Sequence, residues 1–190
     1  MKSKIKNQRS KILGFTMIEL LIVIAVLGVL AVAVLSAINP LEQINRGRDT
    51  GSRSDSEQIL SAVERFYTIQ QYYPWMEAAD DTDQFDWGSL MTSVTRATGG
   101  ALIVDVLAAV GSEEIKQSFA DRLKDVKYGL FAYKKLGTEN SPYICFSPKS
   151  ASFQTEAASR CAGTLPGDWP SSACANTDDC GTKGNCVCLP

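Results

Sequence analysis

The chain has 190 residues, a formal net charge of −2 and no histidine. The lack of histidine excludes Ser-His-Asp and Cys-His catalysis within a single chain, and it removes the commonest metal ligand. The charge is uneven, because residues 1–14 contain five basic residues and no acid, whereas the rest contain 14 basic and 21 acidic ones. Such an acidic body argues against a general nucleic-acid binder, which needs a basic face to neutralise phosphates.

An apolar segment follows the basic start. It contains 19 uncharged residues from Leu20 to Ile38, or 24 residues counted from Phe15, and about 20 are needed for a helix to cross a bilayer. No small-x-small cleavage site with a turn follows it, so we expect it to be retained and not removed as an ordinary secretory signal. The basic residues before it predict a cytoplasmic N-terminus and an exported body.

Glu19 lies directly before the uncharged segment. A carboxylate at the edge of a membrane segment is costly unless a partner neutralises it. One interpretation is that Glu19 snorkels to the lipid headgroups. The other is that it pairs with a cation at the membrane edge, and the residues around Glu19 favour this second interpretation.

The stretch "GFTMIELLIVIAVLGVLA", residues 14–31, resembles the type III signal of type IV pilins and type II secretion pseudopilins. In that family a basic leader ends in glycine, the mature chain begins with phenylalanine, and its fifth residue is glutamate. Gly14, Phe15 and Glu19 occupy these places here. The resemblance is close over about 45 residues and loose over the helix that follows.

The resemblance implies a processing and assembly mechanism. A prepilin peptidase would cut between Gly14 and Phe15 and N-methylate the new Phe15 amine, and Glu19 would meet the amine of a neighbouring subunit. The implied partners are this peptidase, identical or related subunits in a helical filament, an inner-membrane assembly platform and membrane lipid. No cofactor is implied. The protein would be a single-pass membrane protein that becomes extracellular or periplasmic once in a filament.

We expect one long helix from Phe15 to about Tyr73, with residues 15–38 in the membrane and residues 39–73 exported. Proline removes a backbone donor, so Asn39-Pro40 should kink or interrupt it. The stretch "NRGRDTGSRSDSEQ", residues 45–58, has no apolar residue and is interpreted mainly as a solvated charged face. Alternatives are a partly melted connector, or arginines that contact acidic neighbours or phospholipid heads. Helical apolar spacing returns at Ile59, Val63 and Phe66.

Residues 74–160 predict a small α+β domain. The acidic stretch of residues 77–90 is expected to be a solvated loop, with calcium binding as the alternative. Residues 101–110 are apolar and ambiguous, and a helix is expected from Ser112 to about Lys124. Paired strands are expected at 127–135 and 143–147, with a third around 152–155. The predicted fold class is α+β, with a long N-terminal helix on a small antiparallel sheet.

Residues 161–190 form the expected cysteine-rich lobe. The six cysteines are Cys145, Cys161, Cys174, Cys180, Cys186 and Cys188. Their even number and late position after a membrane segment predict disulfides, which short lobes without a core need. Six cysteines allow 15 pairings, among which we favour Cys145 with Cys161 because they bracket a strand and its return. Zinc binding is the alternative to disulfides. The resemblance to some major pseudopilins also implies, as a further alternative, a calcium-binding loop at Asn176, Asp178 and Asp179.

Three functions compete. The first is a structural subunit of a type IV pilus or of a type II secretion-like pseudopilus, without chemistry of its own. The second is a minor pilin or membrane-anchored binding module whose cysteine-rich lobe recognises a surface or ligand. The third, an anchored exported enzyme, is disfavoured because the chain lacks histidine, G-x-S-x-G and S-x-x-K.

Overall fold

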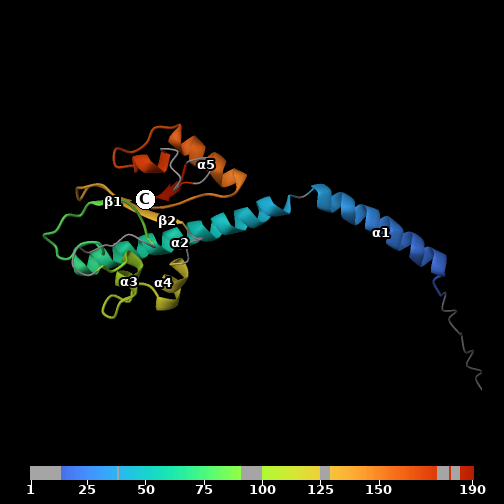
Figure 1. Ribbon diagram of the computed structural model, residues 1–190, viewed down its shortest axis with the longest axis horizontal. Coiled ribbons are helices and arrows are strands. Elements are labelled where there is room, and N and C mark those ends of the chain that lie inside the picture. The colour runs from blue at the N-terminus through green and yellow to red at the C-terminus, as the bar shows by residue number, and fades with distance from the viewer. Residues whose placement is uncertain (1–13, 38, 91–99, 125–128, 175–179, 181–184) are drawn as a thin grey trace, which may run out of the picture. The chain divides into compact units, whose positions relative to one another are not determined.

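The computed structural model of the chain describes residues 14–37, 39–90, 100–124, 129–174, 180 and 185–190. The chain divides into two compact units, residues 1–40 and 41–190 (Figure 1). The described part of the first contains one helix, α1 (Met17–Ala37).

The second helix, α2 (Pro40–Gln70), supports the second unit. The expected single helix is therefore two helices, and the interruption lies where Asn39-Pro40 predicted it, because proline cannot donate the backbone hydrogen bond that would continue the first helix. Gln71 ends α2 in the left-handed region at φ 63°. The helix thus stops three residues before the expected end at Tyr73.

In the described part of the chain, four antiparallel strands form one sheet in the order β1-β2-β3-β4. They are β1 (Phe85–Ser89), β2 (Leu130–Lys134), β3 (Pro142–Phe146) and β4 (Val187–Leu189). The central pair β2–β3 confirms the two predicted strands. The edge strands β1 and β4 were not predicted, because β1 lies in the acidic stretch that was taken for a loop and β4 has only three residues.

The described residues of this unit contain three further α-helices, α3 (Ile103–Ala108), α4 (Gln117–Leu123) and α5 (Ala151–Cys161), and a short 3-10 helix η2 (Ser171–Cys174). The helix expected from Ser112 begins only at Gln117, and Glu113 has a positive φ of 46°. The third strand expected around 152–155 is wrong, because these residues lie in α5. Ser150 begins α5 by accepting a hydrogen bond from the Phe153 N–H, which is a strong helix-starting contact.

The two faces of the sheet belong to two separate hydrophobic cores. Because successive strand residues point to opposite faces, Leu130 and Ile144 pack against α2, α3 and α4. Phe131, Tyr143 and Cys145 point the other way and pack with Trp169 and the remaining buried cysteines of the C-terminal region. In Figure 1 the sheet and α5 are drawn above α2, and α3 and α4 below it.

The loop before η2 is attached to the β2–β3 hairpin by Asp168. Its carboxylate accepts hydrogen bonds from the Ser141 N–H and the Tyr143 hydroxyl, both at 3.0 Å. Burial, together with the hydrogen bond from its hydroxyl to Asp168, raises the pKa of Tyr143 to about 12. Burial alone would raise the pKa of Asp168, but the hydrogen bonds from Ser141 and Tyr143 lower it below its usual value. Hydrogen bonds to Asp168 therefore attach the loop before η2 to the edge of the second core.

Candidate functional site

The site predicted from the sequence lies at the start of α1. Thr16 precedes the helix, and its hydroxyl accepts a hydrogen bond from the Glu19 N–H at 3.3 Å. In return, one Glu19 carboxylate oxygen accepts from the Thr16 N–H at 2.8 Å and from the Thr16 hydroxyl at 2.7 Å. This reciprocal arrangement is a capping box, which satisfies donors left free in the first helical turn.

The capping box gives Glu19 a local partner that neither sequence interpretation included. Within one chain, Glu19 serves the start of its own helix, through Thr16. The signal was present in the sequence as Thr-x-x-Glu directly before an apolar run, which is the pattern that identifies such a box. Thr16 is thus the residue of this site that the sequence reasoning missed.

The bond between Gly14 and Phe15 lies at the surface of its unit. Phe15 is 87% exposed, and a Cβ added at Gly14 would meet no atom within 4 Å. Nothing among the described residues therefore covers this bond, and a small side chain fits at position 14. The basic residues 1–13 lie outside the described part of the chain.

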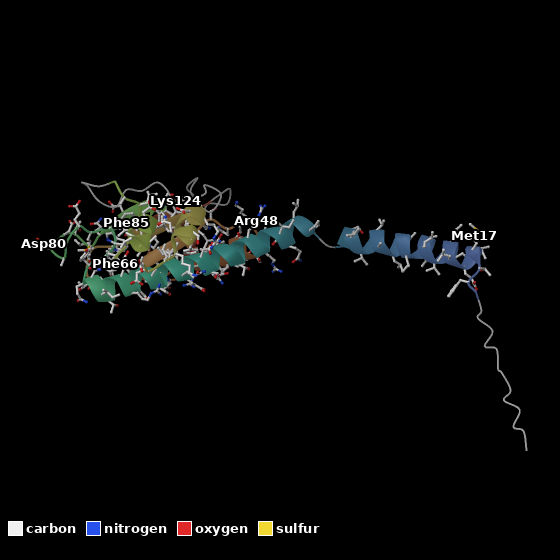
Figure 2. The ribbon with its side chains drawn as sticks, turned by 90° about the horizontal axis from the view of Figure 1, so that it is seen from below. Met17, Arg48, Phe66, Asp80, Phe85 and Lys124 are labelled. Carbon is white, nitrogen blue, oxygen red and sulfur yellow. A yellow bond between two sulfur atoms is a disulfide. The ribbon has the colours of Figure 1, made fainter. Side chains whose placement is uncertain are left out.

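Behind this site, α1 is apolar on every side. Residues 17–36 have a mean hydropathy of 3.1, and in the described part of the chain this is the one helix long and apolar enough to cross a membrane. None of that segment is buried against the rest of the protein, and Figure 2 shows its side chains on all sides of the ribbon. A helix that is apolar all round needs an apolar environment, which is consistent with a single-pass membrane protein.

The charged first half of α2 has one face that contacts the rest of its unit, where Asp49 is buried and Arg46 stays exposed. The expected solvated face is therefore only partly solvated. Spacing of three and four residues brings four side chains to that face, and each reaches α5 or the turn before it: Glu42, Arg46, Asp49 and Arg53. The most enclosed is Asp49, 2% exposed, which accepts from the N–H groups of Lys149 and Ser150 and from the Ser150 hydroxyl. These partners keep a segment without apolar residues helical.

The six cysteines form three disulfides: Cys145–Cys188, Cys161–Cys174 and Cys180–Cys186. The predicted use of the cysteines is confirmed, whereas the favoured pairing of Cys145 with Cys161 is wrong. Cys145 instead faces Cys188 across the β3–β4 ladder, and β4 was not predicted. The zinc alternative is also wrong, because every cysteine sulfur is bonded to another cysteine sulfur.

The acidic stretch of residues 77–90 is fixed by a buried lysine. Lys134 on β2 is 0% exposed, and its ammonium donates to the Asp83 carboxylate and to the carbonyls of Lys135 and Gly137. In the described residues no group of three or more acidic or sulfur ligands is arranged for a metal. The calcium candidates Asn176, Asp178 and Asp179 lie outside the described residues.

Comparison with known proteins gave one match. The model of the prokaryotic N-terminal methylation motif, the signal of type IV pilins and pseudopilins, matches residues 9–35. No curated protein and no solved structure matches the chain at a significant level. The match covers the end of the basic start, the capping box and most of α1, so it supports a type IV pilin-like or pseudopilin protein. It suggests a structural protein, and it implies processing by a prepilin peptidase and assembly with other pilin subunits.

Proposed function

We propose that this protein is a structural subunit of a type IV pilus or of a type II secretion-like pseudopilus. A prepilin peptidase cuts the chain between Gly14 and Phe15 and methylates the new amine. The subunit then enters a helical filament through α1, where Glu19 pairs with the Phe15 amine of a neighbouring subunit. The single observation that carries the proposal is the methylation motif at the start of an uncovered apolar helix.

Two features of the chain, one in each unit, support export of the second unit. Three disulfides form in an oxidising compartment and are rare in the cytosol, and all three lie after residue 140. The basic leader would remain cytoplasmic, because loops rich in lysine and arginine stay inside. A single-pass orientation with residues 41–190 outside follows from these two arguments together.

The capping box defines what Glu19 does before assembly. In the precursor its carboxylate serves Thr16, and after cutting a positively charged amine appears on Phe15, directly before that threonine. Opposite charges attract strongly where water is scarce, and an unpaired buried charge is strongly penalised. Docking would therefore exchange a local hydrogen-bonded partner for a charged one.

The proposal is tested with four variants of the full chain in cells that contain the peptidase and assembly platform. Glu19→Gln keeps a side chain that can cap the helix but removes its charge, whereas Glu19→Ala removes both functions. Thr16→Ser keeps the cap, and Thr16→Ala removes it while keeping the charge. Removing one partner of a buried charge pair at an interface costs several kcal/mol of binding free energy. We therefore expect both Glu19 variants to lower the yield of sheared filaments by about tenfold or more.

The intact mass of the membrane-extracted protein is measured in the same samples. It should correspond to a chain that begins with methylated Phe15 in all four variants, because removing the charge does not hinder insertion. Gly14→Ile should retain the leader, and Gly14→Ala should be cut. A wild-type chain that still begins at Met1 would refute the proposal. Normal filament yield from Glu19→Gln together with failure of Thr16→Ala would assign Glu19 to capping alone.

A further inference from the structure

A cavity of about 460 Å³ opens on the second unit between α2, the end of α4 and the connection from β3 to α5. Three basic side chains line it, from Arg48, Arg122 and Lys149, together with the carboxylates of Asp49 and Asp55. The cavity thus contains one more positive than negative group. We call it the cationic cavity.

Both carboxylates of the cationic cavity are already engaged. Asp55 is 4% exposed and is bound by two nitrogens of Arg122, at 2.8 and 3.1 Å. Asp49 is held by the backbone and hydroxyl donors at the start of α5. Neither carboxylate is therefore a strong partner for the remaining cations of the cavity.

Four hydrogen-bonding side chains that line the cavity have no partner among the described residues. Arg48 and Lys149 are exposed, and their side chains have no hydrogen bond or ion pair with any described residue. The hydroxyls of Ser52 and Ser147, which also line the cavity, likewise have no acceptor in the described part of the chain. Two cations and two hydroxyls around one hollow are complementary to a carboxylate or another oxygen-rich anion.

We infer that the cationic cavity receives acidic side chains of residues 77–86 from a second copy of the chain. This inference rests on the proposed function, because it names the contact by which subunits would meet. Residues 77–86 contain five acids. Asp83 is bound to Lys134, and Asp81 accepts from the N–H groups of Glu77 and Thr82. Asp80 is exposed, and its carboxylate has no polar contact within the described residues.

The two surfaces cannot meet within one copy. Arg48 lies in the first third of α2, and residues 77–86 follow its far end, so they are separated along the helix by about 33 Å at 1.5 Å per residue. Figure 2 shows Asp80 at one end of the second unit and Arg48 toward the other. Contact between two different patches is heterologous, and repeating it generates a ring if the rotation between copies closes and an open helical array if it does not. The charge pattern is therefore compatible with the filament of the proposed function.

Zero-length carbodiimide crosslinking of the full chain tests the contact directly. The reagent joins an ammonium to a carboxylate only when the two touch, so we expect an amide between Lys149 and Asp80 or a neighbouring acid of residues 77–86. Mixing unlabelled copies with ¹⁵N-labelled copies should give crosslinked peptides of mixed label, which proves that two copies are joined. Mass spectrometry of membranes and of sheared filaments provides the measurement.

Charge reversal supplies the control. Arg48→Glu should lower the Lys149 crosslink by about tenfold, because like charges that face each other across a contact repel and weaken it. Lys116→Glu makes the same change of net charge at an exposed position outside the cavity, and it should leave the crosslink within about twofold. Adding Asp80→Lys to Arg48→Glu should recover filament yield above that of Arg48→Glu alone, because an opposite-charge pair is restored.

The result that overturns the inference is processed, assembled wild-type protein without a crosslink between Lys149 and residues 77–86. It is equally overturned if Arg48→Glu impairs assembly but Asp80→Lys neither impairs nor rescues it, since the cavity would then bind another anion such as a lipid phosphate. Failure of the proposed function is distinguishable, because it would appear as a chain that still begins at Met1, whatever crosslinks form.

Discussion

At the scale of single residues, the buried Lys134 explains how an acidic stretch becomes part of a folded sheet. The ammonium has three donors, and all three are used, at 2.8 Å to Asp83, 3.1 Å to the Lys135 carbonyl and 2.8 Å to the Gly137 carbonyl. Burial alone would raise the pKa of Asp83, but the hydrogen bonds from Lys134 and the Gly137 N–H and the lysine charge lower it below its usual value. The ionised form of Asp83 is thus the one that stabilises the fold.

The first prediction concerns this pair. A carboxyl whose pKa is lowered by folding contributes stability that is present above its unfolded pKa of about 3.9, and that is lost as the pH falls through the folded pKa. Asp83→Asn removes this contribution and leaves the Lys134 charge buried without a counter-charge. We expect the free energy of unfolding of the second unit at pH 7 to fall by about 3 kcal/mol, measured by tryptophan fluorescence in denaturant.

Asp80→Asn provides the matched control, because it removes a carboxylate of the same stretch that is exposed. Its unfolding midpoint should equal that of the wild type. The loss of stability below pH 4 should be smaller in Asp83→Asn than in the wild type. Identical pH profiles for Asp83→Asn and the wild type would show that Asp83 does not act through its charge.

At the scale of elements, α2 has two stabilising regions on one face. Its second half contributes Ile59, Val63 and Phe66 to the first core, as their spacing predicted. Its first half is attached to α5 by polar contacts, of which the most buried is the one made by Asp49. A carboxylate at the start of α5 accepts hydrogen bonds from N–H groups that have no partner within the helix. Its negative charge also interacts favourably with the positive end of the helix dipole. The docking of these two helices thus depends on hydrogen bonds to charged groups.

The second prediction follows from this docking. Asp49→Ala leaves the N–H groups of Lys149 and Ser150 without their acceptor, and losing hydrogen bonds to a charged group costs about 1.5–3 kcal/mol. Amide hydrogen exchange of α5 should accelerate, whereas exchange of residues 59–66 in α2 should not change. Glu42→Ala removes a more exposed acceptor of the same helix end, and it should have a smaller effect. Equal acceleration in both variants would contradict a special role for the buried Asp49.

At the scale of the whole molecule, the C-terminal region is a second layer on the outer face of the sheet. Phe131, Tyr143 and Trp169 meet there with disulfide-bonded cysteines. The bridges differ in the length of chain that they close, which is 43 residues for Cys145–Cys188 but only 6 for Cys180–Cys186. In the chain-entropy account these two bridges contribute about 4 and about 2 kcal/mol. The first bridge also joins β4 to the sheet.

The third prediction orders the bridges by their effect. Replacing Cys145 and Cys188 by alanine should lower the free energy of unfolding by about 2 kcal/mol more than replacing Cys180 and Cys186. Denaturant titration of the two double variants measures the difference. Reduction of the wild type should expose residues 161–174 to hydrogen exchange before residues 59–66, because the latter are stabilised by apolar packing. A larger loss from the Cys180–Cys186 variant would contradict this ordering.

Local patterns in the sequence were sufficient for the start and membrane character of α1, for its interruption at Asn39-Pro40 and for the central pair β2–β3. Each of these depends on residues close together in the chain: an uncharged run, a proline, or alternating apolar residues beside a turn. The capping box of Thr16 and Glu19 also depends on residues close together in the chain, because the two are only three positions apart. The local structure at the start of α1 is therefore readable from sequence.

Tertiary structure alone decided the disulfide pairing, the burial of Lys134 and the docking of α2 on α5. The partners in these contacts lie 43, 51 and about 100 residues apart, and no local pattern encodes which distant group a charged or sulfur-bearing side chain will meet. Lysine and aspartate are usually solvated, so sequence alone favours exposure for Lys134, Asp83 and Asp49. They are enclosed here because the fold supplies every partner that water would otherwise provide.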